Sequence, residues 1–195
     1  MPAHFIDIEG IDQSGKKTQS RLLVAKLRRQ GFKVATLDFP VYSTSAGREI
    51  QAFLNGKRNY PPRAVHMLYS LNRWENLARI VRNLDSKDFL LADRYIASNL
   101  AYGLAKGLDL EWLHSLDQGL PKPERVVVLD VPVGSSFARK GERRDLHESN
   151  RALLLRVRRN YLKLANKFNW HVVDGTGAVE IVQSQIWKTL GKVGG

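Results

Sequence analysis

Residues 4–19 read HFIDIEGIDQSGKKTQ, and this stretch decides the fold. The short apolar run at 4–8 predicts a strand, and residues 18–30 predict a helix. Between them, residues 10–16 have the spacing G-x-x-x-x-G-K. Glycines at these positions allow backbone N–H groups to turn toward phosphate oxygens, and the helix N-terminus adds a positive dipole. The stretch therefore predicts a phosphate-binding loop, with Lys16 reaching the outer phosphates.

The residue after Lys16 departs from the usual form of this loop. Ser or Thr is expected there, because its hydroxyl ligates the magnesium ion bound to a nucleotide. This chain has Lys17, followed by Thr18. A lysine in the first turn of a helix is unfavourable against the dipole unless an anion lies nearby. Lys17 is therefore either a tolerated surface residue or an additional phosphate contact.

Strands alternate with helices along the rest of the chain. Further strands are predicted at 32–39, 88–93, 125–130 and 171–174. Helices are predicted from a cap at Ser43 and Thr44 to Gly56, and at 63–84, 98–105, 109–118, 133–139, 148–168 and 179–190. The run RVVVLD at 125–130 is typical of a strand that is buried on both faces. The alternation predicts one α/β domain over residues 1–195, a five-stranded parallel sheet with helices on both faces.

Composition excludes several classes of protein. The chain has 195 residues, of which 43% are hydrophobic and 26% charged, and it has no cysteine. A disordered chain, a disulfide scaffold, a thiolate metal site and a cysteine nucleophile are therefore excluded. No apolar run approaches the roughly 20 residues of a membrane span, and we expect no secretory signal, because the strand-like run begins at residue 4. We expect a cytoplasmic protein with no membrane partner.

The charge of the chain favours an anionic ligand. Lys and Arg number 31 against 19 Asp and Glu, a net charge of +12. Residues 139–163 hold nine basic and three acidic residues, which is +6, or half of the total. This excess suits nucleic acid, an anionic membrane or phosphorylated small molecules, or it forms a solvated helical face. Nucleic-acid surfaces interleave aromatic with basic residues, but this stretch contains only Tyr161, so we expect no nucleic-acid partner.

Several segments resemble thymidylate kinases, which phosphorylate dTMP to dTDP with ATP. They are the phosphate loop at 9–19, the pair Phe39-Pro40, the base-binding helix HMLYSLNRWE at 66–75, the segment Asp93-Arg94-Tyr95 with Ser98, Ala101 and Tyr102, and GLPKP at 119–123. They follow the family order over nearly the whole chain. The resemblance implies the P-loop NTPase fold of nucleoside monophosphate kinases, with the strand order 2-3-1-4-5.

The resemblance also implies the donor site. The expected ATP-binding residues are Gly10, Ile11, Asp12, Gln13, Ser14, Gly15, Lys16, Lys17 and Thr18. Mg²⁺ is expected with ATP, near Asp93, Asp12 and Thr18. Family members place a catalytic arginine either in the phosphate loop or in a lid over the donor phosphates. Position 13 is Gln here, so a lid at about 139–148 is expected to supply it, from Arg143 and Arg144 or, less well placed, Arg139.

For the acceptor, the resemblance implies a dTMP site made of Asp12, Phe39, Tyr42, Tyr69, Arg73, Arg94, Ser98 and Tyr102. Tyr69 corresponds to the aromatic residue that stacks on thymine, and Arg73 to the arginine that donates to its O4. Arg94 matches the arginine that holds the acceptor phosphate, which makes Lys16, Arg94, Asp12 and the lid arginines the expected catalytic residues. Tyr102 matches an aromatic residue that crowds a ribose 2′-hydroxyl.

Two more positions depart from the family pattern and leave the base preference open. Tyr42 follows Val41 where the family often has an arginine, and Gly103 stands where a glutamine is frequent. The expected function is thymidylate kinase in dTTP synthesis, acting as a homodimer. The alternatives are a kinase for another deoxynucleotide or deoxynucleoside, or a catalytically weak phosphate-loop protein that binds nucleic acid or a partner.

Overall fold

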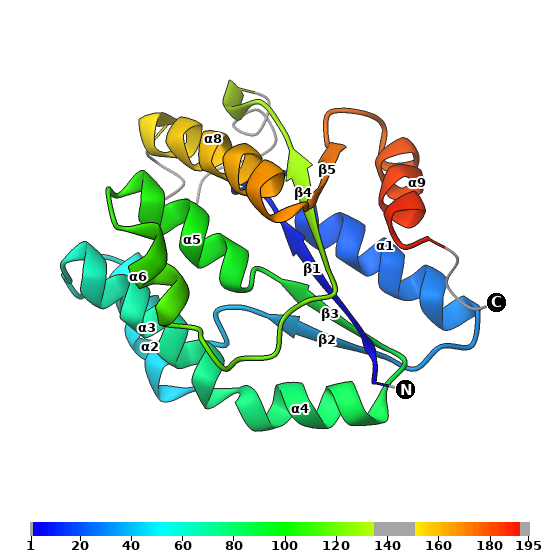
Figure 1. Ribbon diagram of the computed structural model, residues 1–195, viewed down its shortest axis with the longest axis horizontal. Helices are drawn as coiled ribbons and strands as arrows, with labels where there is room; N and C mark the ends of the chain where they lie inside the picture. The colour runs from blue at the N-terminus through cyan, green and yellow to red at the C-terminus, as the bar shows by residue number, and fades with distance from the viewer. Residues whose placement is uncertain (1, 135–150, 192–195) are drawn as a thin grey trace.

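The computed structural model describes residues 2–134 and 151–191. Within these residues five strands form one parallel sheet in the order β2-β3-β1-β4-β5 (Figure 1). The strands are β1 (His4–Glu9), β2 (Val34–Asp38), β3 (Phe89–Asp93), β4 (Arg125–Asp130) and β5 (His171–Asp174). The predicted parallel sheet and its strand order are confirmed. The central position of β1 places the loop that follows it at the middle of the carboxyl edge of the sheet.

Helices cover both faces of the sheet, as predicted (Figure 1). One face packs against α1 (Lys16–Arg29) and α9 (Val179–Thr189) through an apolar core that includes Ile6 and Ile8. The remaining helices are α2 (Ser45–Leu54), α3 (Pro62–Glu75), α4 (Leu77–Ser86), α5 (Ile96–Ala105), α6 (Leu110–Ser115) and α8 (Arg151–Phe168). Of these, α5 and α8 cover the other face of β4, and α4 contacts β3.

β1 carries two acidic residues where the sequence pattern predicts an apolar strand. Ile6 and Ile8 face one core, while Asp7 and Glu9 lie on the alternate face and are completely buried. Among the described residues neither oxygen of Asp7 has a hydrogen-bond partner. Burial and the neighbouring Glu9 raise the pKa of Asp7 well above its usual range. The strand that leads into the phosphate loop therefore places carboxyl groups beneath the site.

The single long helix predicted at 63–84 is wrong. α3 ends at Glu75 and α4 begins at Leu77, with Asn76 between them. The side-chain amide of Asn76 donates to the carbonyl of Asn72 at 2.8 Å, and its backbone N–H bonds to Arg73 instead. An asparagine side chain thus takes the carbonyl that the continuing helix would use, which ends the helix.

Other predicted boundaries differ by a few residues. The cap at Thr44 is confirmed, because its hydroxyl accepts from the N–H of Gly47 at 3.1 Å. The helix predicted at 109–118 is shorter: Asp109 caps its start by accepting from the N–H of Trp112, and α6 ends at Ser115. Most of the helix predicted at 133–139, the lid, and the start of the helix predicted at 148–168 lie outside the described residues. None of the described helices is long and apolar enough to cross a membrane.

Candidate active site

The phosphate loop joins β1 to α1. Gly10 has φ +143°, and a Cβ there would lie 2.7 Å from the carbonyl oxygen of Leu129 and from Ser14 Oγ, so no side chain fits. Gly15 has φ +98° and is the N-cap of α1, and no side chain caps this helix. The N–H groups of the first turn are thus left for an anion.

Lys16 crosses this loop from its own helix. Its Nζ donates to the carbonyl oxygens of Gly10 at 3.1 Å and Ile11 at 2.9 Å. Burial and the charge of Arg94 lower the pKa of Lys16, while nearby carboxylates oppose this shift. Lys17 and Thr18 are exposed on the first turn of α1. A phosphate near the loop would give Lys16 a charged partner in place of backbone carbonyls.

Arg94 lies at the junction of β3 and α5, close to the loop. Its backbone is left-handed, with φ +64°, and Nη2 forms an ion pair with Asp12 Oδ1. The hydroxyl of Tyr102 donates to Asp12 Oδ2 at 2.7 Å. Burial lowers the pKa of Arg94, but Asp12 and other groups raise it more, so the guanidinium stays charged. Asp12 of the phosphate loop therefore binds both Arg94, which follows β3, and Tyr102 of α5.

A buried carboxylate fixes the start of α5. Glu9 Oε1 accepts from the N–H groups of Tyr95 at 2.9 Å and Ser98 at 3.0 Å. Glu9 Oε2 accepts from the hydroxyls of Ser98 and of Tyr161 on α8, each at 2.7 Å. Ser98 Oγ lies 3.4 Å from Arg94 Nη1. Glu9 thus caps α5 from another element and ties β1, α5 and α8 together beside Arg94.

A pocket opens beside these residues and unites the predicted acceptor site. All eight residues expected to bind dTMP line it: Asp12, Phe39, Tyr42, Tyr69, Arg73, Arg94, Ser98 and Tyr102. The structure therefore brings together segments that are up to 90 positions apart in the sequence. The expected lid arginines, Arg139, Arg143 and Arg144, lie outside the described residues.

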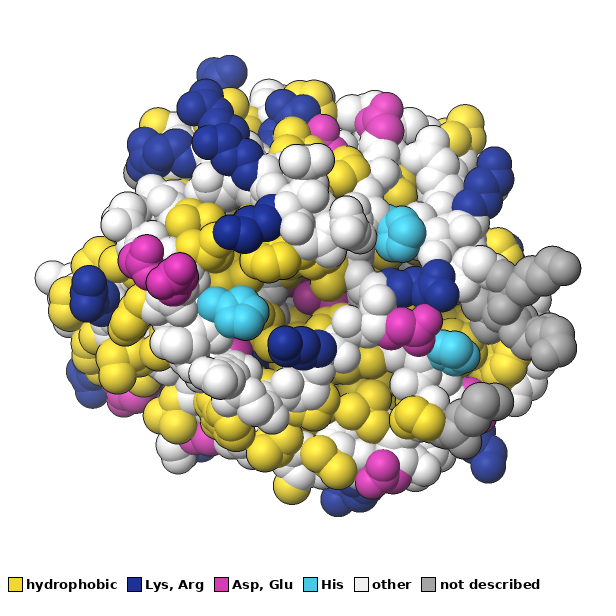
Figure 2. All heavy atoms as spheres, viewed as in Figure 1, with side chains coloured by type: hydrophobic (Ala, Val, Ile, Leu, Met, Phe, Trp, Pro, Cys, Tyr) yellow, Lys and Arg dark blue, Asp and Glu magenta, His cyan; other side chains and the backbone are white. Residues whose placement is uncertain are grey.

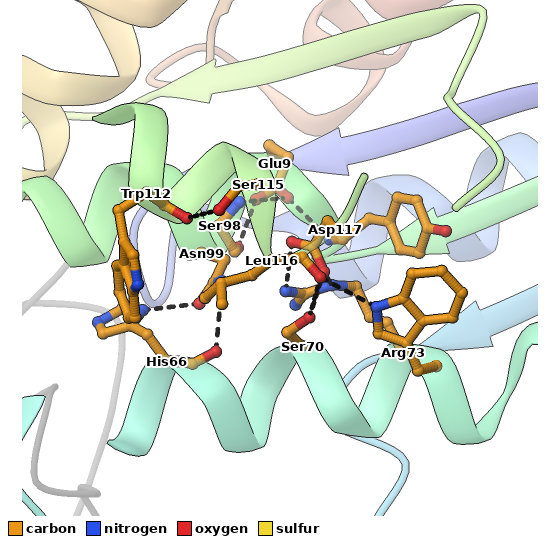
Figure 3. A network of polar contacts seen from close by, with 12 residues as sticks. Glu9, His66, Ser70, Arg73, Ser98, Asn99, Trp112, Ser115, Leu116 and Asp117 are labelled. Carbon is orange, nitrogen blue, oxygen red and sulfur yellow. Dashed lines mark hydrogen bonds and ion pairs between the residues drawn. The ribbon is translucent and has the colours of Figure 1, made fainter. Parts of the chain in front are cut away.

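The far wall of the pocket is formed by α3. Tyr69 is half-buried, and Arg73 is almost completely buried, with 3% of its surface exposed. Arg73 forms a two-point ion pair with Asp117, which lies in the turn after α6 (Figure 3). An arginine held in this way can present its remaining N–H groups in a fixed direction.

The sequence analysis missed several residues of this site. His66, Asn72 and Asn99 also line the pocket, and His66 Nδ1 lies 2.6 Å from Asn99 Oδ1. These three residues lie within the segments 66–75 and 93–102 that resemble the family, so the resemblance could have pointed to them. Asp117 stands outside every quoted segment, so only the fold reveals it.

The carboxyl group of Asp93, which was expected near a metal, lies at the end of β3. Among the described residues its Oδ1 is buried without a hydrogen-bond partner. Burial raises the pKa of Asp93, whereas Lys16 and Arg94 lower it. No group of three or more His, Cys, Asp or Glu that could hold a metal ion occurs in the described residues.

Basic side chains gather over α8, at the upper left of Figure 2. The described part of the basic stretch contains five basic residues of α8, namely Arg151, Arg156, Arg158, Arg159 and Lys163. They do not all face solvent freely: Arg158 forms a two-point pair with Asp130 at 2.6 and 2.8 Å, and Arg156 Nε donates to the carbonyl of Ala105. Part of the excess charge thus fastens α8 to β4 and α5.

Comparison with known proteins agrees with this geometry. The family model for thymidylate kinase matches residues 8–186. Thymidylate kinases of Schizosaccharomyces pombe and Homo sapiens are each 34% identical; the matches cover 93% of this chain and 89% and 87% of those proteins. A probable thymidylate kinase of Pyrococcus abyssi is 35% identical, with 95% of each chain covered.

A solved structure shows the same likeness in three dimensions. Thymidylate kinase from Candida albicans, described as having broad substrate specificity, superposes with a TM-score of 0.87 at 31% identity, covering 97% of this chain and 91% of that one. The pocket beside a phosphate loop, the family model and these relatives lead to one conclusion: the chain belongs to the thymidylate kinase family.

Proposed function

We propose that the protein transfers the γ-phosphoryl group of ATP to dTMP, which gives dTDP and ADP. The observation that carries this proposal is the pocket in which Tyr69 and Arg73 from α3 face Arg94, Tyr102 and Asp12 beside the phosphate loop. An aromatic ring and an arginine at one end suit a base. A partly buried cation, Arg94, suits a monophosphate directed at the loop.

The chemistry needs no protein nucleophile. An oxygen of the dTMP phosphate attacks the γ-phosphorus in line, the bond to the β,γ-bridging oxygen breaks, and ADP leaves with that electron pair. Two anions must approach each other, and cations between them lower the barrier. Lys16 binds the donor phosphates, and Arg94 exchanges Asp12 for the acceptor phosphate.

Mg²⁺ fits the residues present. The buried, unpartnered Oδ1 of Asp93 suits a water bound to the ion, and Thr18 offers a hydroxyl on the first turn of α1. Asp12 already binds Arg94 and Tyr102, so it fits a metal less well. When bound with ATP, the ion supplies charge neutralisation on the phosphates.

The family resemblance supports two further proposals. The lid arginines Arg143 and Arg144 supply transition-state charge, and replacing both with Ala lowers turnover by at least about 100-fold while dTMP affinity is retained.

The second proposal concerns association. Two copies of the chain associate through α3 and α4, where Met67, Leu71, Trp74 and Val81 leave 37–54% of their surfaces exposed. Light scattering on the purified protein tests the dimer; a monomer at micromolar concentration would refute it.

A coupled assay for ADP release tests the function. ATP is supplied with dTMP, dUMP, dCMP, dGMP, dAMP or thymidine, one at a time. We expect dTMP to be the best acceptor, dUMP to be weaker and dCMP to be poor, because Arg73 offers N–H donors to a carbonyl oxygen. Faster transfer to thymidine than to dTMP would indicate a nucleoside kinase. No transfer to any acceptor would indicate a binding protein.

A further inference from the structure

The buried ion pair between Arg73 and Asp117, at the wall of the pocket, also forms two hydrogen bonds. Arg73 Nε donates to Asp117 Oδ1 at 3.1 Å, and Nη2 donates to Oδ2 at 2.7 Å. The two side chains are only 3% and 1% exposed. Two parallel bonds fix the plane of the guanidinium as well as its position. The pair therefore sets the direction in which the other N–H groups of Arg73 point.

Asp117 is held in turn by α3 (Figure 3). Ser70 Oγ lies 2.7 Å from Asp117 Oδ1 and 2.8 Å from the carbonyl oxygen of Leu116, so its proton can go to either. The indole N–H of Trp74 donates to the same carbonyl at 3.0 Å. Ser70, Arg73 and Trp74 share one face of α3. The turn that carries Asp117 is thus fastened to the helix that carries Arg73.

This arrangement decides what the pocket offers to a base. Because Nε and Nη2 face Asp117, the remaining N–H groups of Arg73 are those available to the cavity that Arg73 lines. The carboxylate is already an acceptor for Arg73 and Ser70. At Arg73 the wall of the pocket therefore presents N–H donors. The Arg73–Asp117 ion pair that holds these donors in place carries no net charge. Such a wall suits a carbonyl oxygen and opposes an amino group, which requires an acceptor.

We propose that Asp117 is a positioning residue that sets the base preference of the site. By fixing the direction of the remaining Arg73 N–H groups, it favours 4-oxopyrimidines (thymine and uracil) over the 4-aminopyrimidine cytosine. The inference rests on the proposed function, because it names the part of the acceptor nucleotide that Arg73 reads. Without Asp117 the guanidinium loses its fixed plane, and its direction no longer discriminates between the two classes of base.

Asp117→Asn tests the lock directly. The variant keeps the shape of the side chain but places an amide donor against the guanidinium donors. We expect the ratio of kcat/KM for dTMP to that for dCMP to fall by at least about tenfold, and ATP affinity measured by calorimetry to change by less than about twofold. The matched control is Glu111→Gln, which removes a carboxylate from the exposed surface of α6 and leaves the ratio unchanged.

If Asp117 acts on the base preference only through Arg73, its effect on the dTMP-to-dCMP ratio disappears when Arg73 is absent, and a double-mutant cycle tests this. In an Arg73→Met background, Asp117→Asn is expected to leave the dTMP-to-dCMP ratio unchanged. A further loss in that background would overturn the proposal. Both side chains are neutral in the double variant, which avoids a buried unpaired charge; the Arg73→Met variant keeps the Asp117 carboxylate, so thermal denaturation first checks that this variant is folded.

Arg73→Lys provides a second test that does not require Asp117→Asn to fold. It keeps both charges but cannot form the two parallel bonds. We expect the ratio of kcat/KM for dTMP to that for dCMP to fall in Arg73→Lys toward its value in Arg73→Met. A ratio equal to that of the wild type would overturn the proposal. If the wild-type protein neither binds nor phosphorylates dTMP, the proposed function fails. If it does both and Asp117→Asn retains the ratio, only the positioning role fails.

Discussion

Replacing Tyr161 with Phe removes one buried hydroxyl from the group around Glu9. That hydroxyl donates to Glu9 Oε2 at 2.7 Å and lies 2.9 Å from Ser98 Oγ. Tyr161 is 1% exposed and Glu9 is fully buried, so water does not replace the lost donor. The ring stays in place, and the change therefore isolates a hydrogen bond from the packing around it.

The size of the effect follows from the charge and burial of the acceptor. A hydrogen bond to a charged group contributes about 1.5–3 kcal/mol. Glu9 keeps the N–H groups of Tyr95 and Ser98 and the hydroxyl of Ser98, so we expect a loss of about 2 kcal/mol in the free energy of unfolding. For a chain of this length that loss lowers Tm by about 4–8 °C. Urea unfolding and thermal denaturation measure it.

Tyr60→Phe is the matched control. The hydroxyl of Tyr60 donates to Glu49 Oε2 at 2.7 Å, the same length, but 42% of the Glu49 side chain is exposed. Water can replace this donor, and we expect a loss of less than about 1 kcal/mol. Equal losses in the two variants would refute the reasoning that burial sets the strength of the bond.

Three further changes probe other features. Asp7→Asn should stabilise the fold: the pKa of Asp7 is raised above its ordinary value of 3.8, so the wild type loses stability as pH rises from that value through the folded-state pKa. The difference in Tm between variant and wild type should widen from pH 5 to pH 8, and a constant difference would contradict this. Gly103→Gln, which introduces the residue frequent in the family, should cost about 1–3 kcal/mol in urea unfolding, because a Cβ there would lie 2.5 Å from the buried side chain of Leu113. Lys17→Thr should lower the Mg²⁺ concentration for half-maximal rate at fixed ATP; unchanged dependence, with a collapse in Thr18→Val, would assign the metal to Thr18.

Much of the site could be predicted because its residues stand in a few local segments with a fixed structural context. The loop glycines follow a strand and precede a helix, and the carboxyl ends of parallel strands meet at one edge. Arg94 follows β3 and Asp12 follows the neighbouring β1, so the topology alone brings them together. The eight expected acceptor residues share one pocket for the same reason.

What the sequence did not reveal depends on side-chain competition and on long-range contact. Apolar residues continue at helical spacing through 63–84, and nothing in that pattern indicates that the amide of Asn76 takes the carbonyl of Asn72. Asp117 pairs with a residue 44 positions away. Gly103, which departs from the family pattern, proves to be the point where the side chain of Leu113 from α6 packs against α5, so a Cβ there requires Leu113 to move.

The resting arrangement of charge bears on how a substrate enters. Arg94 is paired with Asp12, and Lys16 donates hydrogen bonds to carbonyl oxygens of the loop, so both cations already have partners within the protein. An arriving phosphate must exchange these partners, which offsets part of its binding energy and favours ligands that carry further contacts to the base. Asp12 keeps the Tyr102 hydroxyl on its other oxygen during this exchange, so it need not turn to solvent when Arg94 moves. The exchange of partners thus links phosphate binding to base recognition, because part of the phosphate's own contribution is offset.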